Sequence, residues 1–135
     1  MKNMEQLRSK NALQAAADKP FEGRNEGDII KKVPTMIQQN GFLGALAFAI
    51  EDEARIAKQK KENGNGTDKE SGYARAFQAI LKHLQSPEVA ICPKEIQCLL
   101  GFAKWLCADD RDSVELRMVT AEAMAYMNVL RRFAK

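Results

Sequence analysis

Apolar residues recur at alternating steps of three and four along most of the chain, which is the period of an amphipathic helix. The pattern is clearest from Ser113 to Lys135. Asp112 followed by Glu115 resembles a capping box and marks the start of this last helix. We expect one stripe of the helix to face the core, formed by Leu116, Val119, Ala123, Tyr126, Leu130 and Phe133.

The back of the last helix is not uniformly polar. Placing residues at about 100° steps gathers a second apolar side, Met118, Ala121, Ala125 and Val129, and a mostly basic flank, Arg117, Asn128, Arg131 and Lys135. The second apolar side, with Met118, Ala125 and Val129 as its candidate interface residues, suits either burial by a neighbouring helix or contact with another copy of the chain. The pattern leaves both interpretations open.

The rest of the chain also indicates helices. Alternating strands are absent and β-branched residues are sparse, so we predict an all-α, single-domain bundle of about five to six helices over residues 1–135. Earlier helices are expected at about 3–18, 28–40, 42–61 and 73–84, with a fifth from Pro93 onwards. Residues 62–72 have the composition of a flexible loop.

Particular residues shape these earlier helices. Asp28 is the expected N-cap of the second helix, Pro34 should kink that helix without ending it, and Asn40-Gly41 should form a corner before the third. The core-facing sets include Leu7, Ala12, Leu13 and Ala16 in the first helix, and Ile96, Leu99, Leu100, Ala103 and Leu106 in the fifth.

The sequence offers little for catalysis or metal binding. Cys92, Cys98 and Cys107 are odd in number and not at zinc spacing, so they are interpreted as small core residues of a reduced protein. His83 could pair with a cysteine, but a lone histidine is more often structural. We expect no enzyme activity, no metal and no cofactor. The longest apolar run, at 41–50, is far shorter than the ~20 residues of a membrane span, and a cytoplasmic location is expected.

Binding is better supported than catalysis, although the formal charge of +3 is only mildly basic. Basic residues form short clusters, and the candidate RNA contacts among them are Lys31, Lys32, Arg75, Lys82, Arg117, Arg131 and Arg132. Taken singly, each cluster is more often a solvated helix face. Arg117 and Arg131, however, share one flank roughly 21 Å apart at 1.5 Å per residue, which spans several nucleotides. Since aromatic residues are few and mostly at core spacing, we expect contacts to phosphates rather than base stacking.

Two segments resemble a known family. KKVPTMIQQNGFLGALAF, from Lys31 to Phe48, is similar to the kklPalI-x-x-nGL-x-x-aLAF signature of the small helical subunit of the Cmr complex, the type III-B CRISPR effector that cleaves RNA complementary to its guide. The end of the chain resembles the same family's YR-x-x-T-x-EAL-x-x-L-x-WLKRFA pattern. The chain departs from it at Leu116, Val129 and Arg131, which change packing or exchange one cation for another.

The resemblance implies a non-catalytic subunit in antiviral defence, stacked in several copies as the minor filament along guide and target RNA. Its partners would be the guide-RNA backbone subunit, the large polymerase-like subunit and further copies of itself. An alternative remains: a helical protein-protein adaptor whose basic clusters only keep it in solution. Salt-dependent RNA binding separates the two.

Overall fold

The computed structural model describes residues 3–18, 24–63 and 72–133, without the side chains of residues 18, 24–28 and 60–63. These residues form helices and no strand, which confirms the all-α prediction. The helices are α1 (Met4–Asp18), α2 (Arg24–Asn63), α3 (Gly72–Gln85), α4 (Leu99–Leu106) and α5 (Ser113–Phe133). The flexible loop predicted at 62–72 falls mostly outside the described residues and stays a prediction.

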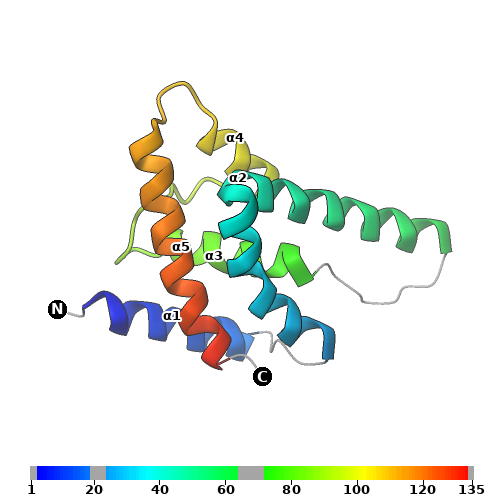
Figure 1. Cartoon of the computed structure of the whole chain (residues 1–135), viewed down its shortest axis with the longest axis horizontal. Coiled ribbons are helices and arrows are strands. Elements are labelled where there is room, and N and C mark those ends of the chain that lie inside the picture. The colour runs from blue at the N-terminus through cyan, green and yellow to red at the C-terminus, as the bar shows by residue number, and fades with distance from the viewer. Residues whose placement is uncertain (1–2, 19–23, 64–71, 134–135) are drawn as a thin grey trace.

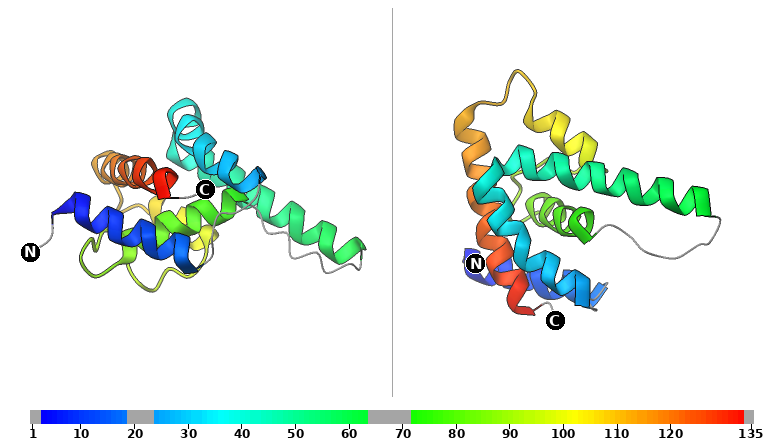
Figure 2. Two further views of the ribbon diagram at one scale, coloured as in Figure 1. Left: turned by 90° about the horizontal axis from the view of Figure 1, so that it is seen from below. Right: turned by 45° about the vertical axis from the view of Figure 1, so that its right-hand side comes forward.

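The helices pack around α3 and α5 (Figure 1). α5 packs against α1, the first part of α2 and α3, while α3 lies against α2 and α4. Figure 2 shows α5 beside the first part of α2, with α1 and α3 behind this pair. Consequently α5 is covered on one side and faces solvent on the other.

α2 is bent sharply at Gly41, the one residue inside it with non-helical dihedral angles, φ 78° and ψ 163°. The helix continues through Pro34, as predicted, and the corner expected at Asn40-Gly41 is confirmed. α2 begins at Arg24, ahead of the predicted cap at Asp28. A glycine such as Gly27 costs only about 1 kcal/mol in a helix, so it does not have to mark the boundary.

The core is built on fully buried aromatic and aliphatic side chains from α2, α3, α4 and α5. Phe42 lies edge-to-face on Phe77 at 5.5 Å and on Phe102 at 5.7 Å between ring centroids. Phe102 is not among the predicted core residues. The predicted stripe of α5 is confirmed at Val119, Ala123, Tyr126 and Leu130, which are all buried, whereas Leu116 is half-buried and Phe133 is 38% exposed.

Several expected core positions were wrong. Leu13 and Leu100 are about half exposed, because α1 packs through Leu7 and Ala12, and α4 packs through Leu99, Phe102 and Leu106. α4 begins at Leu99 with Cys98 as its N-cap, not at Pro93, so residues 93–98 precede it as an irregular segment. Of the three cysteines, Cys92 is buried, whereas Cys98 and Cys107 are exposed.

Candidate functional site

The solvent face of α5 carries three of the four arginines predicted to contact RNA. Arg117, Arg131 and Arg132 are all exposed, and Asn128 is exposed between them. Arg117 Nε lies 3.4 Å from the backbone oxygen of Ser113 on the preceding turn. Because the opposite side of α5 is buried against α1, α2 and α3, these cations form a line along the outside of the bundle.

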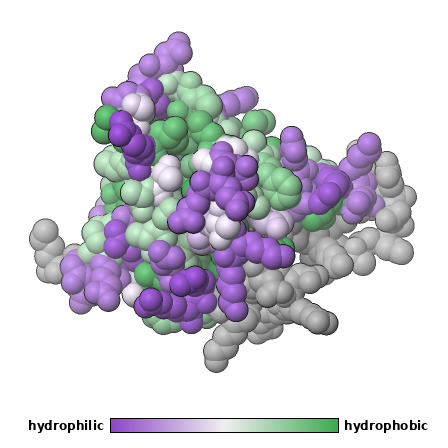
Figure 3. Space-filling view, in the orientation of Figure 1, coloured by the Kyte–Doolittle hydropathy of each residue, from purple (hydrophilic) through white to green (hydrophobic). Residues whose placement is uncertain are grey.

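Apolar side chains run beside these arginines on α5. Met118 is 53% exposed, Val114 is 64% exposed, and Ala121 is exposed as well. Ala125 is half-buried, and so is Val129, which packs against the edge of the core. Hydrophobic and hydrophilic patches lie next to each other on this face in Figure 3. The predicted interface set is therefore divided: Met118 is at the surface, and Val129 is partly a core residue.

The other predicted cations lie on α2 and α3, outside the α5 line. Lys31 and Lys32 are exposed on the first part of α2, and Lys82 is exposed near the end of α3. Arg75 is different, since it is 7% exposed and has an interaction partner. The spacing of Arg75 and Lys82 places them on one side of α3, but the bundle covers that side at the first turns. We therefore leave Arg75 out of the candidate surface.

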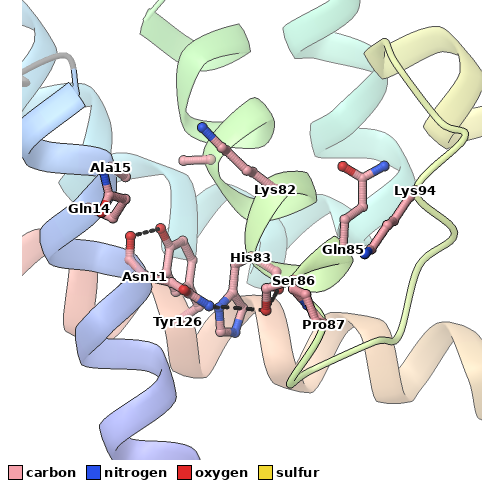
Figure 4. Close-up of a pocket in the computed structure, with 11 residues that line it drawn as sticks. Asn11, Gln14, Ala15, Lys82, His83, Gln85, Ser86, Pro87, Lys94 and Tyr126 are labelled. Atoms are coloured by element: carbon pink, nitrogen blue, oxygen red, sulfur yellow. Dashed lines mark hydrogen bonds between the residues drawn. The ribbon is translucent and has the colours of Figure 1, made fainter.

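A buried polar cluster, which the sequence interpretation does not identify, lies beneath α5 where it meets α1 and α3. Arg8 binds Glu122 with two hydrogen bonds, Nε to Oε2 at 2.7 Å and Nη2 to Oε1 at 2.8 Å. The ring of His83 contacts the same carboxylate, Nε2 to Oε2, at 3.0 Å. Its Nδ1 lies 2.9 Å from Nδ2 of Asn11 (Figure 4). The carboxylate thus joins three helices.

The hydrogen-bond pattern assigns the proton on His83. An amide nitrogen only donates, so Nδ1 of His83 accepts from Asn11 and Nε2 carries the hydrogen that it donates to Glu122. The imidazole is therefore neutral and is stacked on Tyr126, with ring centroids 4.2 Å apart. Burial lowers the pKa of His83, and the hydrogen bond to Glu122 opposes this shift without reversing it.

The same contacts keep Glu122 ionised. Burial alone would raise the pKa of this carboxyl, but the hydrogen bonds from Arg8 and His83, together with the charge of Arg8, lower it. The hydrogen bond to Glu122 in turn raises the pKa of Arg8. The cluster consequently holds one part-buried ion pair and one neutral histidine at neutral pH.

The cluster includes Ser86, which prompts a comparison with a catalytic triad. Ser86 Oγ donates to the backbone oxygen of His83 at 2.9 Å and accepts from Asn11 at 3.2 Å. A nucleophilic serine needs its hydroxyl bonded to an imidazole nitrogen. Here Asn11 occupies one ring nitrogen and Glu122 the other, so the arrangement joins helices and does not activate the hydroxyl.

A cavity of about 300 Å³ lies over this cluster, between α1, the end of α3 and the segment that follows it. Its lining combines Tyr126, Ala15 and Pro87 with Lys82 and Lys94 (Figure 4). His83 does not approach Cys98 or Cys107 through any hydrogen bond found in the described part of the chain, and its ring nitrogens are used by Asn11 and Glu122.

A signal for this cluster is present in the sequence. Glu122 lies four residues before Tyr126 and hence on the same side of α5 as the core stripe. A carboxylate on a core-facing side requires a partner, and Arg8 on the first helix can supply it.

Other site classes find little support in the described residues. Within residues 3–18, 24–63 and 72–133, no group of three or more His, Cys, Asp or Glu side chains is placed to hold a metal ion. Asp112 is used as a helix cap, its Oδ1 accepting from the backbone N–H of Glu115 at 2.9 Å. None of the described helices is long and apolar enough to cross a membrane.

Comparison with known protein families gives a match over nearly the whole chain. A family model described as CRISPR-associated protein (Cas_Cmr5) matches residues 4–135, a span that includes both of the segments quoted above and all five helices. No curated protein and no solved structure matches the chain.

Proposed function

The chain belongs to the Cas_Cmr5 family of CRISPR-associated proteins, the small subunits of the type III-B Cmr complex, and from this premise we propose that it is a non-catalytic subunit that contacts RNA. In this proposal several copies stack along the guide and target RNA, beside the guide-RNA backbone subunit and the large polymerase-like subunit. The RNA would follow the exposed arginines of α5 in the cytoplasm.

The observation that carries the proposal is the two-sided character of α5. One side supplies Val119, Tyr126 and Leu130 to the core, and the other exposes Arg117 and Arg131 about 21 Å apart along the helix. A line of cations on a rigid helix matches the repeated charge of an RNA backbone better than it matches one small anion. Contacts of this kind bind phosphates and are insensitive to sequence.

A non-catalytic role agrees with the state of the polar cluster. Its histidine is neutral with both ring nitrogens hydrogen-bonded, and its carboxylate is paired with Arg8. None of these groups is left to accept or deliver a proton. The cluster is best explained as the polar contact that holds α1 on α3 and α5.

The adaptor alternative draws on the apolar side chains next to the arginines. Met118 and Val114 are more than half exposed, and exposed apolar side chains that lie together often mark a protein contact. In this alternative α5 would bind another protein only, and its arginines would serve solubility.

The test is RNA binding by the reconstituted effector complex over a range of salt concentrations. We expect Arg117→Ala combined with Arg131→Ala to weaken binding of single-stranded RNA and to reduce the log-log salt slope by about 0.7 for each phosphate that is no longer bound. A matched control removes two exposed lysines outside α5, Lys58→Ala with Lys104→Ala, and thus the same charge. An equal slope in the arginine variant and the wild type would favour the adaptor.

A further inference from the structure

A second basic surface lies in the bend of α2, away from the arginines of α5. The two parts of α2 meet at Gly41 at a steep angle, and the first turn of α3 lies inside that angle (Figure 1). A hollow of about 540 Å³ opens there. It is an open hollow on the surface and not an enclosed cavity.

The described residues that line the hollow include cations and amides and no acidic side chain. Lys31 and Lys32 supply two ammonium groups, and Gln39 and Asn40 supply two amides. All four residues are exposed. A site with cations and amides but no carboxylate favours a ligand with negative charge and several hydrogen-bonding edges.

One aromatic residue, Tyr73, forms part of the wall. Tyr73, the second residue of α3, lines the hollow and is half-buried. Phe48, from the second part of α2, meets Tyr73 edge-to-face, with ring centroids 5.0 Å apart and planes at 88°. Phe48 is 43% exposed, unlike the aromatic residues of the core. Tyr73 therefore presents aromatic surface beside the two lysines, and Phe48 packs against its ring.

We propose that this hollow binds one unpaired nucleotide of single-stranded RNA. The base would lie against the ring of Tyr73, which Phe48 holds in place. Gln39 and Asn40 would hydrogen-bond its edge, and Lys31 and Lys32 would bind the adjoining phosphates. Aromatic rings that stack bases and amides that bond base edges are the usual means of recognising unpaired RNA. The inference rests on the proposed function, because it assumes that RNA reaches this chain, and adds a contact to a base.

The combination of groups separates this site from one for an acidic peptide. Lysines alone would suit either ligand, since both carry negative charge. A carboxylate does not use a flat aromatic wall, whereas every base has a π-face and a polar edge at right angles to it. An acidic peptide would therefore leave the Tyr73 ring without a role.

Affinity measurements on the reconstituted effector test the aromatic wall. We expect Tyr73→Ala to weaken binding of single-stranded RNA by between fivefold and a hundredfold, roughly the value of one base–aromatic contact, and to leave the salt slope unchanged. Tyr73→Phe should bind like the wild type. Lys31→Ala with Lys32→Ala should instead lower the slope by about 0.7 per phosphate contact. Leu100→Ala, which removes another exposed apolar side chain, should have no effect on affinity.

RNA with abasic positions provides a second, independent readout. If Tyr73 contacts a base, Tyr73→Ala should cause no further loss of affinity on abasic RNA, because the partner is already missing. 5-Iodouridine in the RNA should photo-crosslink to Tyr73 in the wild-type complex. The crosslinking result does not depend on whether Tyr73→Ala folds, since it uses the native chain.

The possible failures are distinguishable. Normal salt-dependent RNA binding by Tyr73→Ala, with crosslinks elsewhere, would overturn the nucleotide site and leave the proposed function standing. If neither the arginine variant nor the lysine variant changed RNA binding, both the nucleotide site and the proposed function would be overturned. Binding of an acidic peptide that competes with RNA but is insensitive to Tyr73→Ala would also reject a base contact here.

Discussion

The carboxylate of Glu122 forms polar contacts that join three helices. It lies on α5 and is 8% exposed, and it binds Arg8 of α1 and His83 of α3. A buried carboxylate is costly unless it is paired and fully hydrogen-bonded. Its contribution is therefore to fix one arrangement of α1 against α3 and α5, since any other arrangement would leave a buried charge without partners.

We expect Glu122→Gln to lower the free energy of unfolding by about 1–3 kcal/mol at neutral pH, because hydrogen bonds to a charged group are replaced by weaker ones. The pH dependence should change as well. Both His83 and Glu122 have a lower pKa in the folded protein, so the unfolded state binds more protons below about pH 6.5 for the histidine and about pH 4.5 for the carboxyl. Stability should therefore fall as the pH falls through this range.

Urea denaturation of the full chain across this pH range checks the expectation. Below about pH 4.5 the wild type should lose more stability than Glu122→Gln, which has no carboxyl to protonate at this position. Glu51→Gln is the matched control, since Glu51 is an exposed glutamate on α2. Parallel pH profiles for the wild type and Glu122→Gln would show that protonation of Glu122 does not cause the loss of stability at low pH.

Single residues also show what periodicity can and cannot predict. The spacing in α5 correctly identifies Val119, Ala123, Tyr126 and Leu130 as core, because a helix fixes which residues share a side. It fails for Leu13 and Leu100, since a helix with more apolar residues than its neighbours can cover leaves some exposed. Which of them is covered depends on neighbouring helices that are distant in sequence.

At the scale of elements, Gly41 determines the shape of α2. Its dihedral angles, φ 78° and ψ 163°, lie in a region that is essentially restricted to glycine. A Cβ added at this position would meet no atom within 4 Å. The cost of a side chain here would therefore arise from the backbone and not from a clash.

Gly41→Ala should consequently destabilise the protein by about 1–3 kcal/mol, the cost of a residue held in such a region. Gly101→Ala is the matched control, because Gly101 lies inside α4 and its added Cβ would make ordinary contacts of 3.5 Å and longer. That change should be neutral or stabilising by up to about 1 kcal/mol. Chemical denaturation measures both, and equal stability of Gly41→Ala and the wild type would mean that the bend does not need glycine.

Boundaries of elements are predicted with uneven success for a physical reason. The corner at Asn40-Gly41 and the cap at Asp112 are local signals, and both are confirmed. The start of α2 and the segment before α4 depend on packing as well as on local sequence. Gln85 Nε2, for example, donates to the backbone oxygens of Pro93 and Ile96, which holds residues 93–96 outside the helix expected to begin at Pro93.

For the whole molecule, the all-α class follows from composition and periodicity, while the sites depend on which surfaces remain uncovered. Arg75 and Lys82 are indistinguishable on a helical wheel, yet one is buried and the other exposed. The hollow at the bend of α2 could not be predicted, because Lys31 and Lys32 lie on α2, Tyr73 lies on α3, and they come together only in the folded bundle. Tertiary packing thus decides the candidate sites, even where local structure is predictable.

Stacking of several copies is a property of the whole molecule, and Met118 offers its clearest test. Exposure separates the members of the second apolar side of α5, since Met118 is 53% exposed, whereas Val129 is half-buried against the core. A charge at Met118 should leave the fold intact, because exposed substitutions usually change stability by no more than about 0.5 kcal/mol. A charge at Val129 would disturb folding and stacking together.

We therefore expect Met118→Glu to reduce the number of copies that assemble in the reconstituted complex, since a charge in the centre of an apolar contact must be desolvated without a partner. Light scattering measures the assembly, and circular dichroism checks that helicity is unchanged. Leu100→Glu is the control, because Leu100 is 52% exposed on α4 and receives the same charge. Fewer copies with Leu100→Glu but not with Met118→Glu would move the contact from α5 to α4 and contradict the expectation for Met118.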